Sequence, residues 1–115
     1  MGLDDIKCRI SAAEEKAGRA PGSVTLIAVS KVQPPNRVTA VLEAGHRVFG
    51  ENYVQEAQGK WPGWRDRYPG VELHMIGPLQ SNKARGAVEL FDAIHTLDRM
   101  TLARKLAQQI AQQGR

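Results

Sequence analysis

The spacing of apolar residues along the chain alternates between the period of a helix and the two-residue period of a strand. Residues 3–18 place apolar side chains on one helical face and end at Gly18, which predicts an N-terminal helix. Four further segments predict strands, and each of them precedes a segment with helical spacing. These strand–helix pairs are 24–30 with 35–44, 47–49 with 51–60, 71–76 with 79–90, and 92–97 with 99–112.

Two local features refine this pattern. The segment that contains Trp61, Pro62 and Gly63 follows the second of these helices and predicts a loop, because proline and glycine interrupt regular structure. Asp98 directly precedes the last helical segment, and aspartate is a favoured N-cap residue. We therefore expect the last helix to begin at an Asp98 cap.

Alternating strands and helices favour the α/β class, with an N-terminal helix followed by four βα units that have parallel strands and right-handed crossovers. The units could form a small open sheet or part of a (β/α)8 TIM-type barrel. A whole barrel needs about 250 residues, so this chain of 115 residues would hold only the first half of one. Both architectures place their chemistry at the carboxyl ends of the strands.

Composition narrows the classes of function. The formal net charge is +4, the basic residues are scattered, and only 5% of residues are aromatic, which together disfavour a nucleic-acid-binding protein. The single cysteine, Cys8, cannot form an internal disulfide, so a reducing compartment and hence the cytoplasm are expected. No apolar stretch is long enough to span a membrane, which disfavours a membrane protein.

Lys31 is the sharpest candidate for chemistry. It ends the most strand-like segment, "VTLIAVSK", and strand alternation puts Ile27, Val29 and Lys31 on one face. An amine at the rim of an apolar face would be desolvated, and a neutral amine is the form that condenses with a carbonyl to a Schiff base. The alternative is that Lys31 simply ends the strand in water.

The other strand ends are also polar. Asn52 in "FGENYVQE" can donate and accept hydrogen bonds to a small ligand, although Glu51 and Asn52 could equally cap the following helix. Gly77 in "GPLQSNK" allows close backbone approach, but the glycine spacing is not that of a phosphate-binding P-loop. His74 is expected to be a hydrogen-bonded structural residue, and no metal site is expected.

Four segments taken together carry a resemblance to a known family. In this order and spacing, "AVSK", "FGENYVQE", "GPLQSNK" and "IHTLDR" resemble the N-terminal half of the pyridoxal phosphate homeostasis proteins, which belong to the alanine-racemase-like, fold-type III group. The resemblance covers essentially the whole chain. It implies a single-domain (β/α)8 barrel preceded by a helix, of which residues 1–115 would be the N-terminal half.

The resemblance also implies a function and a site. Lys31 would hold pyridoxal 5′-phosphate (PLP) as a Schiff base, Asn52 would lie beside the cofactor, and Ile76 and Gly77 would line the pocket. These proteins are regarded as non-catalytic, so no catalytic residue is expected. They bind PLP, a form of vitamin B6, and are thought to buffer it in the cytoplasm or deliver it to PLP-requiring apo-enzymes.

The sequence departs from the family pattern at two points. The segments that bind the PLP phosphate in the family lie late in the barrel and have no counterpart in these 115 residues. Many relatives carry a second lysine two residues after the PLP lysine, where this chain has Gln33. A role in transfer assigned to that second lysine therefore does not carry over.

Two alternatives of different classes stay open at this point. One is a PLP-dependent, racemase-like enzyme, which would need a second acid–base residue facing the cofactor. The other is a cofactor-free interaction module, in which Lys31 is only a solvated strand end. A four-stranded half barrel would also expose open sheet edges, which favour pairing with another copy or with the missing C-terminal half.

Overall fold

The computed structural model describes residues 2–115, which form an N-terminal helix followed by four strand–helix units, as the sequence pattern predicts. None of the helices in this range is long and apolar enough to cross a lipid bilayer. The helices are α1 (Leu3–Lys16), α2 (Pro35–Glu43), α3 (Val54–Arg67), α4 (Ala84–Leu90) and α5 (Met100–Gln113), with a short 3-10 turn, η1 (Ser81–Lys83), before α4. The strands are β1 (Ala28–Val29), β2 (Val48–Glu51), β3 (Glu72–Met75) and β4 (Ala93–Ile94).

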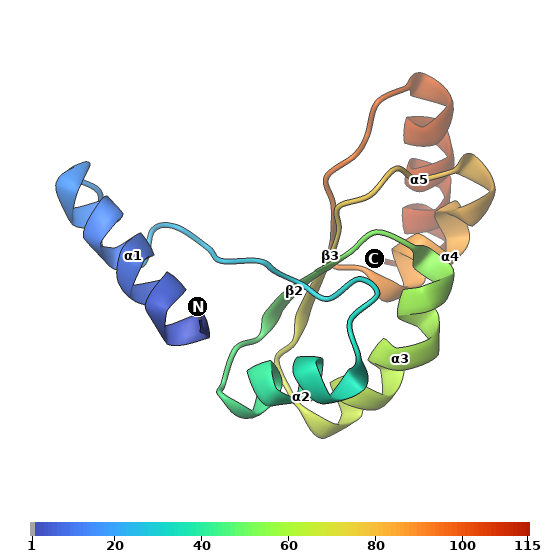
Figure 1. Ribbon diagram of the computed structural model, residues 1–115. Coiled ribbons are helices and arrows are strands. Elements are labelled where there is room, and N and C mark those ends of the chain that lie inside the picture. The colour runs from blue at the N-terminus through green and yellow to red at the C-terminus, as the bar shows by residue number, and fades with distance from the viewer. Residues whose placement is uncertain (1) are drawn as a thin grey trace.

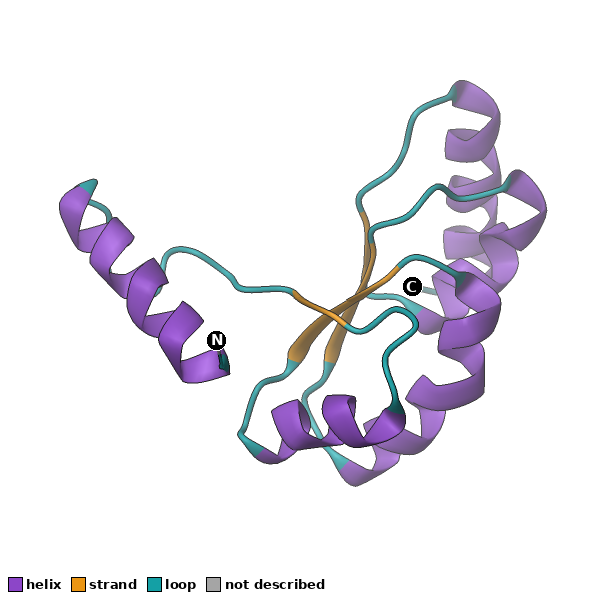
Figure 2. Cartoon of the chain, in the orientation of Figure 1, coloured by secondary structure: helices purple, strands orange, loops and turns teal. Residues whose placement is uncertain are grey.

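The strands form one parallel sheet in the order β1-β2-β3-β4. The two central strands pair from Val48 opposite Glu72 to Glu51 opposite Met75. Figure 1 shows α2 to α5 on one side of the sheet and α1, in blue, apart from them on the other side, and Figure 2 shows how short the strands are compared with the helices. Parallel strands in chain order with their helices on one side are the arrangement of half a (β/α)8 barrel, so the expected fold class is confirmed.

The core lies between the sheet and the helices that follow its strands. Alternate residues of the central strands, Phe49, Leu73 and Met75, are buried there because alternate side chains point to the same face. The ring centroid of Trp61 lies 4.9 Å from the ring centroid of Phe49 and also 4.9 Å from that of Trp64. This row of three aromatic rings fixes α3 on the sheet.

The prediction of a loop around Pro62 is wrong. Helix α3 continues through Pro62 as far as Arg67, because Ala57, Trp61 and Trp64 share its buried face at helical spacing. A proline inside a helix costs about 3 kcal/mol. Burial of a large apolar side chain contributes about 1.5–3 kcal/mol, so the two indoles together offset that cost.

The prediction that Asp98 caps the last helix is also wrong, and the outer strands are shorter than predicted. The N-cap of α5 is Arg99, no side chain caps this helix, and the Asp98 carboxylate instead accepts a hydrogen bond from the Arg99 guanidinium at 2.6 Å. Strands β1 and β4 each pair with a single neighbour. With hydrogen bonds on one side only, regular strand geometry is confined to two residues in each of them.

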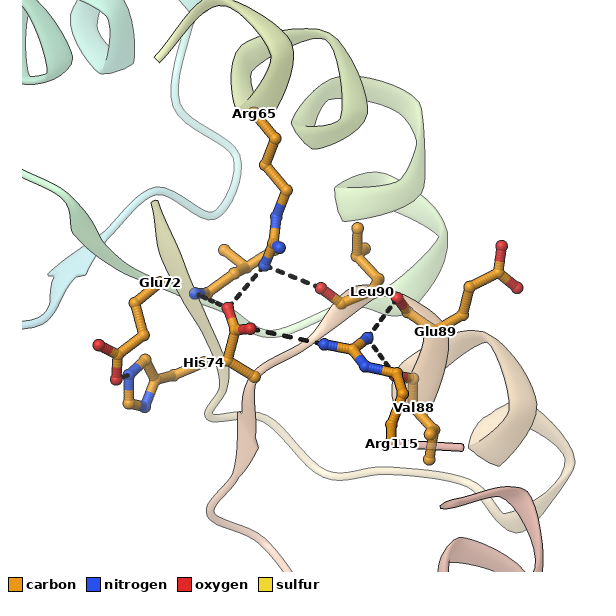
Figure 3. Close-up of polar contacts among 9 residues, drawn as sticks. Arg65, Glu72, His74, Val88, Glu89, Leu90 and Arg115 are labelled. Atoms are coloured by element: carbon orange, nitrogen blue, oxygen red, sulfur yellow. Dashed lines mark hydrogen bonds and ion pairs between the residues drawn. The ribbon is translucent and has the colours of Figure 1, made fainter. Parts of the chain in front are cut away.

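An arginine–aspartate cluster joins α3, α4 and the sheet at the edge where the strands begin (Figure 3). Asp92 accepts hydrogen bonds at the same carboxylate oxygen from the Leu73 N–H at 2.8 Å and from Arg65 at 2.7 Å. Arg65 also donates to the carbonyl of Leu90, at the end of α4. A cation at a helix C-terminus is favourable because it faces the negative end of the helix dipole.

We expect the Asp92→Ala substitution to lower the free energy of unfolding by about 1–3 kcal/mol, because the Leu73 N–H loses its side-chain acceptor and the Arg65 guanidinium loses one of its two acceptors. Urea denaturation of both proteins measures this as a lower midpoint with an unchanged slope. Asp66→Ala, at an exposed aspartate of α3, is the matched control and should change stability by less than about 0.5 kcal/mol. Equal effects of the two substitutions would contradict this role of Asp92.

Candidate functional site

The polar segments after the strands meet at one edge of the sheet, because parallel strands end on the same side. The Ser30 N–H donates to the Gly50 carbonyl at 3.0 Å, and the Ile76 N–H donates to the Glu51 carbonyl at 2.9 Å. These bonds continue the ladders beyond the strand ends. They place the segments that carry Lys31, Asn52 and Gly77 side by side at the carboxyl edge of the sheet.

An apolar floor lies on the face of the sheet that points away from α2 to α5. Phe49 and Glu51 point towards the helices, so Gly50 between them faces the other way. A Cβ atom on Gly50 would lie 2.9 Å from Ile27 and 3.0 Å from Ile76, so these two isoleucine side chains close over the glycine. The structure thus brings Ile76 together with Ile27, which the sequence placed on the same face as Lys31.

Gly77 lies close to the backbone of Asn52. A Cβ atom there would lie 2.5 Å from the carbonyl oxygen of Asn52 and 2.7 Å from its Cα. The Gly77 carbonyl in turn accepts a hydrogen bond from Thr96, after β4, at 2.6 Å. The exits of β2, β3 and β4 are therefore in direct contact, and Asn52 and Gly77, which the sequence predicted as site residues, lie against each other.

Lys31 lies in an exposed turn after β1, and the structure shows no hydrogen bond or ion pair to its amine within residues 2–115. The turn is closed by the Gln33 N–H, which donates to the Ser30 carbonyl at 3.3 Å. The desolvation of Lys31 expected from the apolar strand face is absent here. Instead, Lys31 is exposed to solvent.

Glu51 is a residue whose role the sequence did not reveal. It is part of β2 rather than a cap of α3, and its side chain is fully buried on the helix side of the sheet. One of its oxygens accepts hydrogen bonds from the Ser30 hydroxyl at 2.5 Å and from the Trp61 indole at 2.9 Å, and Lys60 lies 3.1 Å away. Glu51 is therefore anchored by Ser30, which follows β1, and by two residues of α3, and no local sequence signal connects these segments.

The two histidines near this edge form a pair. His74 lies 2.7 Å from His95, ring nitrogen to ring nitrogen, and 2.8 Å from Glu72. His74 is thus the hydrogen-bonded structural residue that the sequence predicts. Residues 2–115 contain no group of side chains with the arrangement of a metal site.

The sequence and the fold of this chain are similar to those of known proteins. No protein-family model matches the chain. Over 108 residues, the chain is 45% identical to the pyridoxal phosphate homeostasis protein of Escherichia coli strain K12, an alignment that covers 93% of this chain and 46% of that protein. The structure of PipY from Synechococcus elongatus with PLP bound superposes with a TM-score of 0.78 at 43% identity, over 96% of this chain and 50% of PipY.

The chain is related to the pyridoxal phosphate homeostasis proteins. An unknown protein from Bifidobacterium adolescentis has the same fold, with a TM-score of 0.87 at 34% identity over 96% of this chain and 49% of that one. The resemblance seen in the four sequence segments is confirmed across almost the entire chain. The chain spans about half the length of the pyridoxal phosphate homeostasis proteins that it matches.

The contact between Gly77 and Asn52 predicts the effect of a single added methyl group. In Gly77→Ala the new Cβ meets backbone atoms, which cannot rotate away, so we expect a loss of about 1–3 kcal/mol in the free energy of unfolding. Urea denaturation measures the loss. Gly59→Ala is the matched control, because a Cβ there meets nothing within 4 Å and alanine favours the helix by about 1 kcal/mol. A Gly77→Ala protein as stable as the unmodified one would show that the two loops are not in close contact.

Proposed function

We propose that this chain binds pyridoxal 5′-phosphate through Lys31 and acts as a PLP carrier or buffer. One observation carries the proposal: Lys31 lies at the carboxyl edge of a parallel sheet, next to the segments that bear Asn52 and Gly77. Two comparisons support it. A relative from Escherichia coli is named for pyridoxal phosphate homeostasis, and PipY has been solved with PLP bound.

The side chains at this edge offer partners for the aldehyde and for the ring of such a cofactor. PLP supplies an aldehyde, with which a neutral primary amine condenses to a Schiff base with loss of one water. Lys31 provides a primary amine, and its side chain is exposed to solvent and free to reach a ligand. Asn52 provides an amide that can donate and accept at a ring substituent. Ile27 and Ile76, which close over Gly50, provide an apolar surface for one face of an aromatic ring.

We further propose that residues 1–115 are one half of a single barrel domain. Both outer strands have an unpaired side, and a hollow with a mainly apolar lining lies at each. The hollow beside β1 has a volume of about 450 Å³ and is lined by residues such as Ile6, Leu26 and Val41. The hollow beside β4 has a volume of about 490 Å³ and is lined by residues such as Ile94 and Leu106.

Further βα units, supplied by the rest of a longer polypeptide, are the occupant we propose for these edges. The length of the relatives supports this proposal, because they are about twice as long as this chain. They would also bring the phosphate-binding segments that the family resemblance assigns to the later part of the barrel. Pairing of two copies through the same edges is the alternative, and the mass of the assembly in solution distinguishes the two.

We propose binding and delivery of PLP rather than catalysis. A racemase-like reaction needs a second acid–base group facing the cofactor. The histidines nearest this edge, His74 and His95, are bonded to each other. Incubation of the PLP-loaded protein with L-alanine tests this directly, and formation of D-alanine above the rate of free PLP would establish the enzyme instead.

The test of cofactor binding is a PLP titration followed by borohydride reduction and peptide mass spectrometry. Reduction traps a Schiff base as a stable amine, so we expect a pyridoxyl adduct at Lys31 and its loss in Lys31→Met. Lys105→Met, at an exposed lysine of α5, is the matched control and should keep the adduct.

Labelling that is equal at Lys31 and at the other exposed lysines would contradict selective binding by this chain. The same titration on a chain extended to the full length of the relatives then separates two explanations. An adduct that appears only in the extended chain would show that the second half completes the pocket. Absence of the adduct from both chains would favour the cofactor-free module.

A further inference from the structure

The turn that carries Lys31 has an unfavourable backbone conformation. Val32, the residue after Lys31, has a φ angle of +54°, in the left-handed region, and is the one non-glycine residue with positive φ among residues 2–115. A β-branched side chain is strongly disfavoured there. Val32 is 74% exposed, so apolar burial does not compensate for the unfavourable conformation. Other contacts must therefore stabilise this turn.

Hydrogen bonds from α3 and β2 fix the backbone on both sides of Lys31. On one side, the Val32 N–H donates to the Glu56 carboxylate at 2.7 Å. On the other side, the Ser30 carbonyl accepts from the Lys60 ammonium at 3.0 Å, and the Ser30 hydroxyl donates to Glu51. The backbone is thus held immediately before and immediately after Lys31, while its side chain is free.

Lys60 joins the two carboxylates into one unit. Its ammonium lies 3.1 Å from Glu51 and 2.9 Å from Glu56, and its side chain is only 17% exposed. The hydrogen bond from Lys60, together with that from the Val32 N–H, lowers the pKa of the Glu56 carboxyl below its ordinary value. Glu56 is therefore charged at neutral pH, and a charged acceptor makes a stronger hydrogen bond to a backbone N–H.

We propose that Glu51, Lys60 and Glu56 form a clamp that positions Lys31 for reaction with the cofactor aldehyde. None of the three touches the Lys31 amine, so they are positioning residues that act through the backbone of residues 30–32. This inference rests on the proposed function of Lys31. The strained Val32 sets the direction in which the chain leaves Lys31, and the clamp holds the strain in place.

The first test compares two substitutions at Glu56, which is partly exposed and can be changed without leaving a hole in the core. Glu56→Ala removes the acceptor of the Val32 N–H, whereas Glu56→Gln keeps an oxygen at that place. We expect the PLP concentration for half-maximal adduct at Lys31 to rise between about tenfold and a hundredfold in Glu56→Ala, which is the range expected for the loss of one hydrogen bond to a charged group. Glu56→Gln keeps a neutral acceptor, whose hydrogen bond is weaker than that of the carboxylate, so its affinity should lie between those of Glu56→Ala and the unmodified chain.

A second measurement needs no cofactor. Nitrogen-15 relaxation gives the order parameters of the Lys31 and Val32 amides, which we expect near 0.85 (about the value of rigid backbone) in the unmodified chain and below about 0.6 in Glu56→Ala. Gln55→Ala removes an exposed side chain from the same turn of α3 and should change neither the order parameters nor the adduct. The midpoint of urea unfolding, recorded for each variant, separates local loosening from global destabilisation.

Val32→Gly tests the strain itself, because glycine adopts positive φ without steric conflict. If the clamp offsets the strain at Val32, Glu56→Ala should weaken PLP binding less in the Val32→Gly protein than in the unmodified one. Equal losses in both proteins would show that the strain at Val32 plays no part, and would overturn this element of the proposal.

The outcomes separate the clamp from the proposed function. An unmodified chain that forms no adduct at Lys31, even when extended to full length, contradicts the proposed function, and the order parameters still decide whether the clamp holds the turn. Selective labelling of Lys31 that is the same in Glu56→Ala as in the unmodified chain overturns the clamp and leaves the proposed function intact. If the amide of Val32 loses order in Glu56→Ala without a change in labelling, the three residues only link the turn after β1 to α3. That result would also overturn the clamp.

Discussion

The alternation of side chains along β2 is the constraint on which the rest of this structure depends. Successive residues of a strand point to opposite faces of the sheet, so the segment from Phe49 to Asn52 is divided between two environments. Phe49 and Glu51 enter the space under the helices, where they meet Trp61. Gly50 and Asn52 face the other side, where Gly50 admits the two isoleucines and Asn52 contacts Gly77. A shift of one residue in the register of β2 would turn Phe49 and Glu51 away from the helices and turn Gly50 and Asn52 into the core.

The two faces are coupled through Glu51. A carboxylate with no exposed surface is costly unless it is paired and hydrogen-bonded. One oxygen of Glu51 accepts hydrogen bonds from the Ser30 hydroxyl and the Trp61 indole and forms an ion pair with the Lys60 ammonium. The other oxygen has no hydrogen-bond donor among the described residues. These partners come from Ser30, which follows β1, and from α3. The burial of the Glu51 carboxylate on the helix side of β2 therefore fixes Ser30, the residue before Lys31, at the end of the neighbouring strand.

The order of elements and the location of the candidate site were predictable from the sequence because both depend on local patterns. The period of apolar residues predicts the strands, and parallel strands bring Lys31, Asn52 and Gly77 to one edge whatever their detailed contacts. The features that could not be predicted depend on residues far apart in the chain. Pro62 stays helical because Trp61 packs on Phe49, and Glu51 leaves its capping role because Ser30 and Lys60 bind it. Asp98 fails to cap α5 because a neighbouring arginine binds it instead.

The short outer strands bear on the chemistry of Lys31. β1 has a neighbour on one side only, its Val29 is 47% exposed, and Lys31 follows it into solvent. A strand that paired with the open side of β1 would cover Val29 and withdraw water from the turn beyond it. Desolvation favours the neutral form of an amine, which is the form that attacks a carbonyl. In a half barrel, the clamp supplies the direction of Lys31, whereas the dry surroundings of its amine depend on whatever completes the sheet at β1. The geometry of the site and its reactivity thus have separate origins in this fold.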